Sequence, residues 1–441
     1  MKRQRTPYGR HMMKQMRFST AKSTPQEWQM RRGLSVLALS VILSVPIVLN
    51  AQSLMWLGTL GQSSTAHGVS DDGRMVVGYS VLMNGMNRAF RWAPETGMLS
   101  LGTLPGGNQS VAYGVSADGN SIVGESPWNW QGAGGGAFLW RADRGIGSLG
   151  TLPGGLSSGA RAVSYNGSVV VGWSSTAGYS PIYAFRWRSG SGMQSLGTLG
   201  GSESRALGVS RDGSVVAGWS FNHLSERWAF VWKANTGMQA LYPLAVCCGE
   251  AYGVSDDGLV IAGRSHSATT ERWHACLWVW NASDYSPRDL GTLGGNESIA
   301  YACTNNQIAV GWSHNASGQR RAFRWTPTAG MIDLSEAYAS VLPPGAYLEA
   351  AYDITPDGRY IVGRGYNAER GRFEAFLLDT LCLANDGDVD NNGCVDDADL
   401  LAVLFAFGSA GEILGRVDTN CDGTVDDADL LTVLFNFGSG C

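Results

Sequence analysis

The chain has 441 residues, of which 44% are hydrophobic and 16% charged, with 60 glycines. This length suggests more than one domain, and abundant glycine with little charge favours a turn-rich fold over long helices. After residue 51 the sequence retains Lys233 as its single lysine, so no basic stripe remains and we expect no nucleic-acid binding.

The N-terminal region has a secretory pattern. A basic pair, an apolar run and a small residue follow one another within residues 31–51. This order is typical of a signal peptide cleaved after Ala51. We therefore assign residues 1–51 to a signal peptide, with Met30 as an alternative start, and expect a secreted, extracellular or cell-surface protein. The alternative is an uncleaved membrane anchor, which Pro46 within the apolar run disfavours.

The next region is repetitive. One unit recurs seven times at intervals of about 44 to 49 residues, a period typical of repeat architectures. Each unit contains four short apolar runs separated by turn residues, as in the fourth unit at 193–199, 206–210, 215–220 and 228–232. The units open at Leu57, Leu101, Leu149, Leu196, Leu241, Leu290 and Leu334.

The second and third runs of a unit are joined by a Ser-x-Asp-Gly turn, which supplies the positive φ that a tight hairpin needs. The sixth unit lacks this glycine, because Gln307 stands in its place. Four strands in each of seven units predict an all-β fold, a seven-bladed propeller of four-stranded blades over residues 52–380. We expect the small-residue strand to be innermost, the Gly-Met strand to be outermost, and strand 54–60 to complete the last blade and close the ring.

The repeated motifs resemble those of the HAF family of extracellular repeat proteins. The shared motifs are Leu-Gly-Thr-Leu-Gly-Gly, Gly-Val-Ser-x-Asp-Gly, Val-Val-Gly-Trp-Ser and Arg-Ala-Phe-Arg-Trp. The family's His-Ala-Phe is altered here to sequences such as Arg88-Ala89-Phe90, although His274-Ala275 keeps its first two residues. The resemblance implies an exported propeller and brings no established activity with it.

The propeller sequence carries no recognised catalytic motif, such as H-E-x-x-H, G-x-S-x-G or a P-loop. His223, His266 and His314 follow equivalent strands, so they either gather on one rim as a metal or acid–base site or lie solvated in separate blades. Glu203 and Glu297 belong to a repeated element and are interpreted as structural. We expect a non-catalytic binding or interaction surface; the alternative is a polysaccharide hydrolase or lyase.

Aromatic residues in two loops are candidates for ligand binding. Trp128, Trp130 and Tyr179 interrupt the repeat, and His223 lies in the corresponding loop of the next unit. Exposed aromatic rings stack on sugars or anchor proteins, so we predict a glycan or a protein as the ligand. The alternative is that the two tryptophans only cover the edge of a blade.

Eight cysteines suit an oxidising compartment. Cys276 and Cys303 replace core residues and are interpreted as buried free thiols, whereas the vicinal Cys247 and Cys248 either bridge each other or stay free. Among the three pairings open to the last four cysteines, we favour Cys382–Cys394 with Cys421–Cys441.

The acidic C-terminal region, residues 382–441, contains two twelve-residue loops with oxygen donors at positions 1, 3, 5, 9 and 12 and glycine at position 6. This pattern is typical of EF-hand calcium loops, with Asp in place of Glu at position 12 and a backbone carbonyl at position 7. We predict two Ca²⁺ ions. Their ligands would be Asp388, Asp390, Asn392, Cys394, Asp396 and Asp399 in the first loop, and Asp418, Asn420, Asp422, Thr424, Asp426 and Asp429 in the second.

Each loop is followed by an apolar stretch, 400–407 or 430–437, that predicts a short helix. This duplicated loop and helix resembles a type I dockerin. The resemblance implies docking to a cohesin or another cell-surface or extracellular protein through loop positions 10 and 11. Those positions are Asp397 and Ala398 in the first copy, and Asp427 and Ala428 in the second.

Overall fold

The computed structural model describes residues 52–127, 135–245, 247–380, 387–390, 394–409, 414–419 and 424–441. The predicted signal peptide lies outside these residues. In the described part of the chain, no helix is both long and apolar enough to cross a membrane.

Most of the described chain forms antiparallel sheets. Five of them have four strands each, in the order of their neighbours. Their strands are β2 (Ser63–Val69), β3 (Val76–Val81), β4 (Asn87–Ala93), β5 (Gly97–Gly102); β6 (Val111–Val115), β7 (Ser121–Pro127), β8 (Gly135–Arg141), β9 (Gly145–Gly150); β18 (Gly249–Val254), β19 (Val260–His266), β20 (Trp273–Trp280), β21 (Tyr285–Asp289); β22 (Gly294–Cys303), β23 (Ala309–Asn315), β24 (Arg320–Thr326), β25 (Gly330–Asp333); and β26 (Tyr347–Ile354), β27 (Tyr360–Asn367), β28 (Arg372–Asp379), β1 (Ser53–Trp56).

The remaining strands belong to one eight-stranded sheet, so the third and fourth units do not form separate four-stranded sheets as predicted. Its strands are β10 (Ser158–Val163), β11 (Val169–Ser175), β12 (Ile182–Arg188), β13 (Gly192–Ser195), β14 (Gly200–Val209), β15 (Val215–Asn222), β16 (Arg227–Lys233) and β17 (Gly237–Ala240). The junction is narrow, because β12 and β14 pair in parallel only at Ile182 and Glu203.

β14 begins at Gly200, earlier than the run at 206–210 suggests, so that Glu203 lies within the strand where it pairs with Ile182. Gly201 lets the extended strand pass close to β15, since a Cβ there would lie 2.5 Å from the carbonyl oxygen of Asn222. The Gly-Gly pair has the composition of a loop, and its role as a strand start is a tertiary effect.

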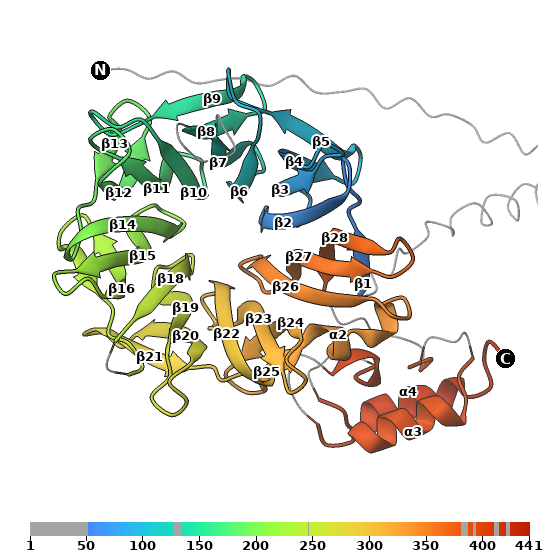
Figure 1. Cartoon of the computed structure of the whole chain (residues 1–441). Coiled ribbons are helices and arrows are strands. Elements are labelled where there is room, and N and C mark those ends of the chain that lie inside the picture. The colour runs from blue at the N-terminus through green and yellow to red at the C-terminus, as the bar shows by residue number, and fades with distance from the viewer. Residues whose placement is uncertain are drawn as a thin grey trace, which may run out of the picture. The chain divides into compact units, whose positions relative to one another are not determined.

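The sheets follow one another around a central axis, as in a β-propeller (Figure 1). The innermost strands contact their neighbours in the cyclic order β2, β6, β10, β14, β18, β22, β26 and back to β2. The Ala-Phe strand is third in six units, and Ala275-Cys276 takes its place in the fifth. The strands that begin with Gly-Met, which are β5, β13, β17 and β25, are outermost as expected, and β9, β21 and β1 hold that place in the other three units. The first and last units meet at a junction that we call the seam. There β1 pairs antiparallel with β28, from Ser53 opposite Asp379 to Trp56 opposite Phe376.

Recurring serines join neighbouring sheets. A buried serine at the start of an inner strand accepts a hydrogen bond from the alanine N–H of the preceding Ala-Phe strand, as in Ala89–Ser110 and Ala275–Ser298 at 2.9 and 2.7 Å. Its hydroxyl donates to a glycine carbonyl, which for Ser110 is that of Gly102 at 2.6 Å. Ser64 makes the same bond to Ala375 at 2.8 Å, across the seam. A buried polar group needs such partners, which explains the serines in the repeat.

Phenylalanines of the Ala-Phe strands fill the space between sheets and are fully buried: Phe90, Phe138, Phe185, Phe230, Phe323 and Phe376. In the fifth unit Cys276 takes this position, and Trp278 occupies the vacated volume. A Cβ on Gly263 would lie 2.8 Å from the Trp278 ring, as one on Gly124 would lie 2.6 Å from Phe138. Cys276 is a buried free thiol, as predicted.

The Ser-x-Asp-Gly turns have a common hydrogen-bond pattern. In the first unit the Ser70 hydroxyl donates to Asp72 Oδ1 at 2.6 Å, and the Ser70 Oγ accepts from the N–H of Met75 at 2.9 Å. In the sixth unit, where glycine is missing, Gln307 itself adopts a φ of 63°. The turn geometry is therefore kept although its glycine is lost.

The described chain also contains a few short helices, one group before the last sheet and one after it. A helix α2 (Leu334–Ala337) and a 3₁₀ turn η1 (Ala339–Val341) lead into β26, and the C-terminal region contains α3 (Asp397–Ala406), η2 (Gly415–Val417) and α4 (Asp427–Asn436). The small core between α3 and α4 is made of buried valines: Val389, Val395, Val403, Val425 and Val433.

Two equivalent pairs of backbone hydrogen bonds join the two halves of the C-terminal region. Val395, before α3, exchanges backbone hydrogen bonds with Gly438 and Ser439 after α4, at 2.8 and 3.0 Å. Val425 makes the equivalent pair with Gly408 and Ser409 after α3, at 2.8 and 2.9 Å.

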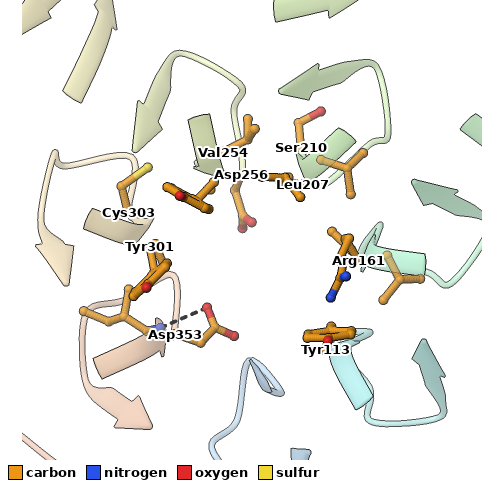
Figure 2. Close-up of a pocket in the computed structure, with 18 of the residues that line it drawn as sticks. Tyr113, Arg161, Leu207, Ser210, Val254, Asp256, Tyr301, Cys303 and Asp353 are labelled. Carbon is orange, nitrogen blue, oxygen red and sulfur yellow. Dashed lines mark hydrogen bonds between the residues drawn. The ribbon is translucent and has the colours of Figure 1, made fainter. Parts of the chain in front are cut away.

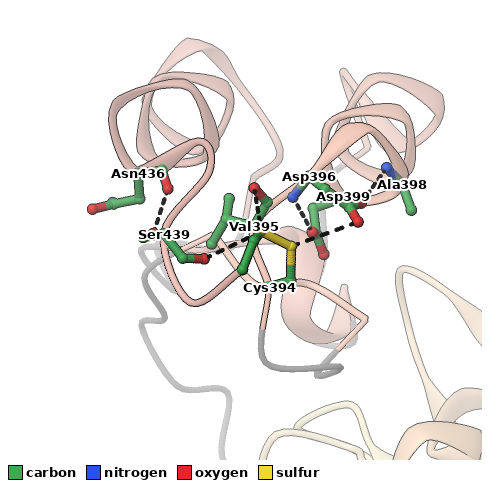
Figure 3. Close-up of a disulfide and its surroundings, with 8 residues drawn as sticks. Cys394, Val395, Asp396, Ala398, Asp399, Asn436 and Ser439 are labelled. Carbon is green, nitrogen blue, oxygen red and sulfur yellow. Dashed lines mark hydrogen bonds between the residues drawn. A yellow bond between two sulfur atoms is a disulfide. The ribbon is translucent and has the colours of Figure 1, made fainter.

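Among the described residues of this region, Cys394 and Cys441 form a disulfide (Figure 3). The predicted pairings of Cys394 with Cys382 and of Cys421 with Cys441 were therefore wrong. The reciprocal backbone hydrogen bonds explain the error, because they bring the chain after α4 beside the first loop, although the two cysteines are 47 residues apart in the sequence. Cys382 and Cys421 lie outside the described residues.

Candidate ligand-binding channel and calcium loops

A cavity of about 580 Å³ lies among the inner strands of the propeller. Figure 2 shows its lining residues arriving from separate strands around an open space. The main contributors occupy one repeat position, between the alanine and the next small residue of each inner strand: His67, Tyr113, Arg161, Leu207, Tyr252, Tyr301 and Tyr352.

Each of these residues sits at a break in strand register. The pairing of inner and second strands skips one residue there, as between Ala66 and Gly68 or between Ala160 and Ala162. A β-bulge of this kind leaves one residue outside the ladder and re-aims its side chain, and bulges are frequent beside functional sites. The repeat thus presents one variable side chain per inner strand to the channel.

Arg161 is the central cation of the channel wall. Its guanidinium lies over the Tyr113 ring, 3.9 Å from the centroid, and its Nη2 is 3.1 Å from Glu125 Oε2. The Tyr113 hydroxyl donates to the other oxygen of Glu125 at 2.9 Å. Burial would lower the pKa of Arg161, but Glu125 and Tyr113 raise it, so the guanidinium stays charged.

His67 is a neutral aromatic surface. Its ring contacts three tyrosine rings, those of Tyr79, Tyr113 and Tyr352, with centroids 5.6, 5.2 and 4.9 Å away. Burial, followed by the charge of Arg161, lowers the pKa of His67 to about 3. His67 therefore stays uncharged at physiological pH.

Asp353 replaces a small residue of the repeat and adds a carboxyl group to the wall. Its Oδ2 accepts from the Val69 N–H and its Oδ1 from the Ile354 N–H, both at 3.0 Å. Burial raises the pKa of Asp353 to about 7 against these two bonds, and the carboxylates of Asp71 and Asp256 add to the rise. Asp353 is thus poised to exchange a proton near neutral pH.

One end of the cavity is crossed by an arginine. Arg211, at the turn of the fourth unit, has its Nη1 3.0 Å from Asp71 of the first unit and 2.7 Å from Asp256 of the fifth. The guanidinium also lies 3.5 Å from the centroid of the Tyr165 ring. The pair with Asp71 joins the fourth unit to the first, which is not its neighbour in the ring, so Arg211 narrows the channel at the end where the Ser-x-Asp-Gly turns lie.

Arginine and tryptophan side chains alternate towards the other end. Arg205 has its guanidinium carbon 5.0 Å from the Trp173 ring and 5.6 Å from the Trp219 ring, and it pairs with Glu203 at 2.8 Å. Both Arg205 and Trp219 line the cavity. Glu203 therefore positions an arginine, which fits its interpretation as structural.

Glu250 is enclosed by donors near the same end. Arg227 and Arg264 approach its two oxygens at 2.5 and 2.8 Å, and the Tyr252 hydroxyl also donates to it. Burial would raise the pKa of Glu250, but Arg264, Tyr252 and Arg227 together lower it. Glu250 is accordingly a fixed anion that holds Tyr252 in place.

The residues predicted from sequence as ligand-binding lie elsewhere. Tyr179 and His223 are exposed in loops and do not line the cavity. Trp128 and Trp130 lie outside the described residues. His223, His266 and His314 belong to separate units, and within the described ranges no cluster of potential metal ligands contains more than one of them.

The channel residues were missed because they share a repeat position that reads as part of a small-residue strand. A signal was present: the residue after the inner-strand alanine is large or charged in every unit. A large side chain at one position of an otherwise small-residue strand marks a place that the close packing of that strand does not explain.

The first of the two predicted calcium loops brings carboxylates together. Oxygens of Asp388, Asp390 and Asp399 lie within 4.8 Å of one another. Asp399 is buried, and its Oδ1 accepts from the N–H groups of Val389 and Asp390 at 2.6 and 2.9 Å. An all-oxygen set with several carboxylates fits Ca²⁺, the hard cation predicted here.

The second loop repeats this arrangement. Asp429 accepts from the Thr419 N–H at 2.6 Å, and its other oxygen accepts from the Asp426 N–H at 2.9 Å. Asp396 and Asp426 cap α3 and α4, each in a reciprocal capping box with the aspartate three residues later. Position 12 of each loop thus also fixes the start of the following helix. Asn392, Asn420 and Asp422 lie outside the described residues.

The surface next to the loops is apolar. Asp397, Ala398, Asp427 and Ala428 are all exposed at the helix starts. Both helices also expose equivalent large residues, with Phe405 87% and Phe435 82% accessible. The others are Leu401, Leu404, Phe407, Leu431, Leu434 and Phe437.

Comparison with known protein families gives no match, and comparison with curated proteins gives none either. Solved structures do resemble the chain. An oligogalacturonate lyase in complex with manganese aligns at a TM-score of 0.50 and 12% identity, over 75% of this chain and 95% of that one. The β-propeller domain of the trilobed protease from Pyrococcus furiosus aligns at 0.45 and 9%, over 73% and 94%.

TolB from Acinetobacter baumannii aligns at a TM-score of 0.37 and 16% identity, over 54% of this chain. The match spans 56% of TolB's own length. At such identities the likeness concerns the fold alone, which is that of a β-propeller.

Proposed function

We propose that this protein is an exported seven-bladed propeller that binds a carbohydrate in its central channel without transforming it. A calcium-dependent C-terminal module would tether it to a partner outside the cell. The observation that carries the proposal is the set of bulged residues, which present tyrosine, histidine and arginine side chains to a cavity of about 580 Å³.

The blade number follows from treating the two halves of the eight-stranded sheet as separate blades. Strands β10–β13 and β14–β17 repeat the four-strand order of the other sheets and meet only at Ile182 and Glu203. Together with the five separate sheets they give seven blades, one for each sequence repeat.

Carbohydrate suits the chemistry of the channel wall. Aromatic rings bind the C–H faces of sugars, while arginine and carboxyl groups hydrogen-bond to their hydroxyls. Tyr113, Arg161 and Glu125 hold each other in place before a ligand arrives. Such preorganisation lowers the entropic cost of binding.

The tether is proposed from the C-terminal module. Its duplicated apolar surface around Phe405 and Phe435 is larger than the few exposed side chains expected of a soluble helix pair. Its resemblance to a dockerin supports a cohesin or a related surface protein as the partner, with Asp397, Ala398, Asp427 and Ala428 at the edge of the contact.

The test is a glycan array probed with the full exported chain and with Leu207→Trp. Leu207 lines the cavity, and a larger side chain there would fill the channel without leaving a polar partner unpaired. We expect the wild type to bind a defined set of glycans and Leu207→Trp to lose at least about 90% of the signal, roughly 1.4 kcal/mol.

Tyr179→Ala is the control, because Tyr179 is exposed in a loop away from the cavity. It should bind as the wild type does. Unchanged binding by Leu207→Trp together with loss in Tyr179→Ala would place the ligand on the loops and contradict the channel proposal.

A second candidate function is a polysaccharide lyase or hydrolase. Asp353 favours it, because a carboxyl group with a pKa of about 7 in a cavity that Arg161 also lines suits proton abstraction. The oligogalacturonate lyase among the similar structures shares the fold and does not indicate which residues of this chain would act in catalysis. A degradation screen decides: turnover that disappears in Asp353→Asn supports the enzyme, and binding without turnover supports the binding protein.

A further inference from the structure

The fifth unit contains a cluster of soft metal ligands that neither the channel nor the calcium loops use. Cys247 and Cys248 precede β18, and His266 is the last residue of β19. The two sulfur atoms and a ring nitrogen of His266 lie within 4.8 Å of one another, and all three residues are half-buried.

The backbone holds the cluster together. The His266 N–H donates to the Cys248 carbonyl at 3.3 Å, and the Ser265 hydroxyl donates to the same oxygen at 3.1 Å. The His266 ring is oriented by Trp273, whose ring centroid lies 4.1 Å away. Cys248 adopts a φ of 74°, so the strand start turns sharply at this residue.

The spacing is close to that of a metal site. Zinc binds thiolate sulfur at about 2.3 Å and imidazole nitrogen at about 2.0 Å, which puts tetrahedral ligand atoms roughly 3.5 to 3.8 Å apart. Rotation of the three side chains would bring their ligand atoms from the 4.8 Å limit seen here to these separations. Two thiolates and an imidazole are ligands that zinc and other thiophilic cations prefer.

We propose that Cys247, Cys248 and His266 form a Zn²⁺ site with its fourth position open to water or to an added ligand. Each cysteine binds as thiolate and gives its proton to solvent, so no oxidant or reductant is needed. Three protein ligands and an open position are the arrangement of catalytic rather than structural zinc sites.

The neighbouring unit provides a natural comparison. His314 in β23 occupies the position that His266 has in β19. It lies opposite Arg320 of the next strand, and its ring contacts the Trp312 ring edge-on, with the centroids 5.0 Å apart. The residues that correspond there to the two cysteines are Asn296 and Glu297. The thiols are therefore a departure of one unit from the repeat, as a specific site requires.

The test uses the full chain, treated with a phosphine reductant and held in excess Ca²⁺ so that the C-terminal loops are saturated. Titration with Co²⁺ should give thiolate-to-cobalt charge-transfer absorption at one ion per chain, and Zn²⁺ should abolish this absorption. Cys247→Ser and His266→Ala should each weaken Co²⁺ binding by roughly a hundredfold, because one of three ligands is lost.

His314→Ala is the matched control and should leave the affinity within about twofold of the wild type. Absence of the absorption band, or an equal loss in His314→Ala, would overturn the proposal. So would a purified chain whose Cys247–Cys248 peptide is lighter by two hydrogens, since a vicinal disulfide leaves no thiolate to bind a metal.

Discussion

In the propeller, the residues that recur are the serines, phenylalanines and turn aspartates that join strands and sheets, whereas the channel position holds four different residue types over the seven units. In the C-terminal module the opposite holds. Its two copies repeat the residues with chemistry, from Asp388 and Asp418 at position 1 to Asp399 and Asp429 at position 12. Repetition supplies scaffold in the first region and the proposed calcium ligands in the second.

This difference teaches where to look for function in a repeat protein. A ring of sheets is stable when every interface is alike, so departures such as Asp353, Arg211 or the Cys247–Cys248 pair carry the specific chemistry. A pair of ion sites needs the same donor set twice, so the repeated residues themselves are the site.

The largest expected effect comes from breaking one copy of the repeated ligands. Asp399→Ala removes a carboxylate of the first loop and the acceptor of three backbone N–H groups. Calorimetric titration of the full chain should show uptake of two Ca²⁺ ions in the wild type and one in Asp399→Ala. Asp397→Ala, two residues earlier and exposed, should still take up two; loss of an ion there would contradict the ligand assignment.

A smaller effect is expected from opening the ring. Removing residues 52–56 deletes β1, which covers one side of β28. The exposed edge and the loss of the Leu54 and Trp56 packing should lower the free energy of unfolding by about 3 to 5 kcal/mol. Chemical denaturation measures this, with Met55→Ala as control because that side chain is largely exposed. An unchanged midpoint in the truncated chain would show that the seam needs no fourth strand.

The smallest effect concerns a single departure from the repeat. Asp353 has a pKa raised from 3.8 to about 7 in the fold. It therefore contributes stability below about pH 4 that is lost as the pH rises through 7. Asp353→Asn should match the wild type near pH 4 and exceed its stability by about 1 to 2 kcal/mol near pH 8, after allowance for screening by cavity water. A difference that does not change with pH would mean that Asp353 is ionised throughout.

The sequence predicted most of the scaffold. Strand order within a unit followed from runs bounded by turns, and the partner of β1 followed from the last unit ending at its third strand. The single pair that joins β12 to β14, Ile182 with Glu203, was not predictable, because it depends on how two units meet in three dimensions. The pairing of Cys394 with Cys441 was missed for the same reason, since reciprocal backbone hydrogen bonds bring the chain after α4 beside the first loop.

The candidate site was less predictable than the scaffold. Aromatic residues such as Tyr179 were chosen because they lie in loops between the repeated strands. The side chains that line the cavity belong to the repeated inner strands themselves. What directs them inward is the bulge in each inner strand, for example at Tyr301 between Ala300 and Ala302. A bulge of this kind arises from strand pairing in three dimensions and has no fixed residue type, so only the large residue that follows the inner-strand alanine indicates it.

The seam also has a consequence for biosynthesis. Ser64 and its partner Ala375 are 311 residues apart, so β1 and β2 leave the ribosome long before the strands beside which they belong. Throughout that interval the nascent chain carries a β-strand without a sheet and a growing arc of blades with two open edges. Such edges invite pairing with other chains. Synthesis of this protein therefore calls for a chaperone, or for passage through a translocon in the unfolded state, until β28 is made.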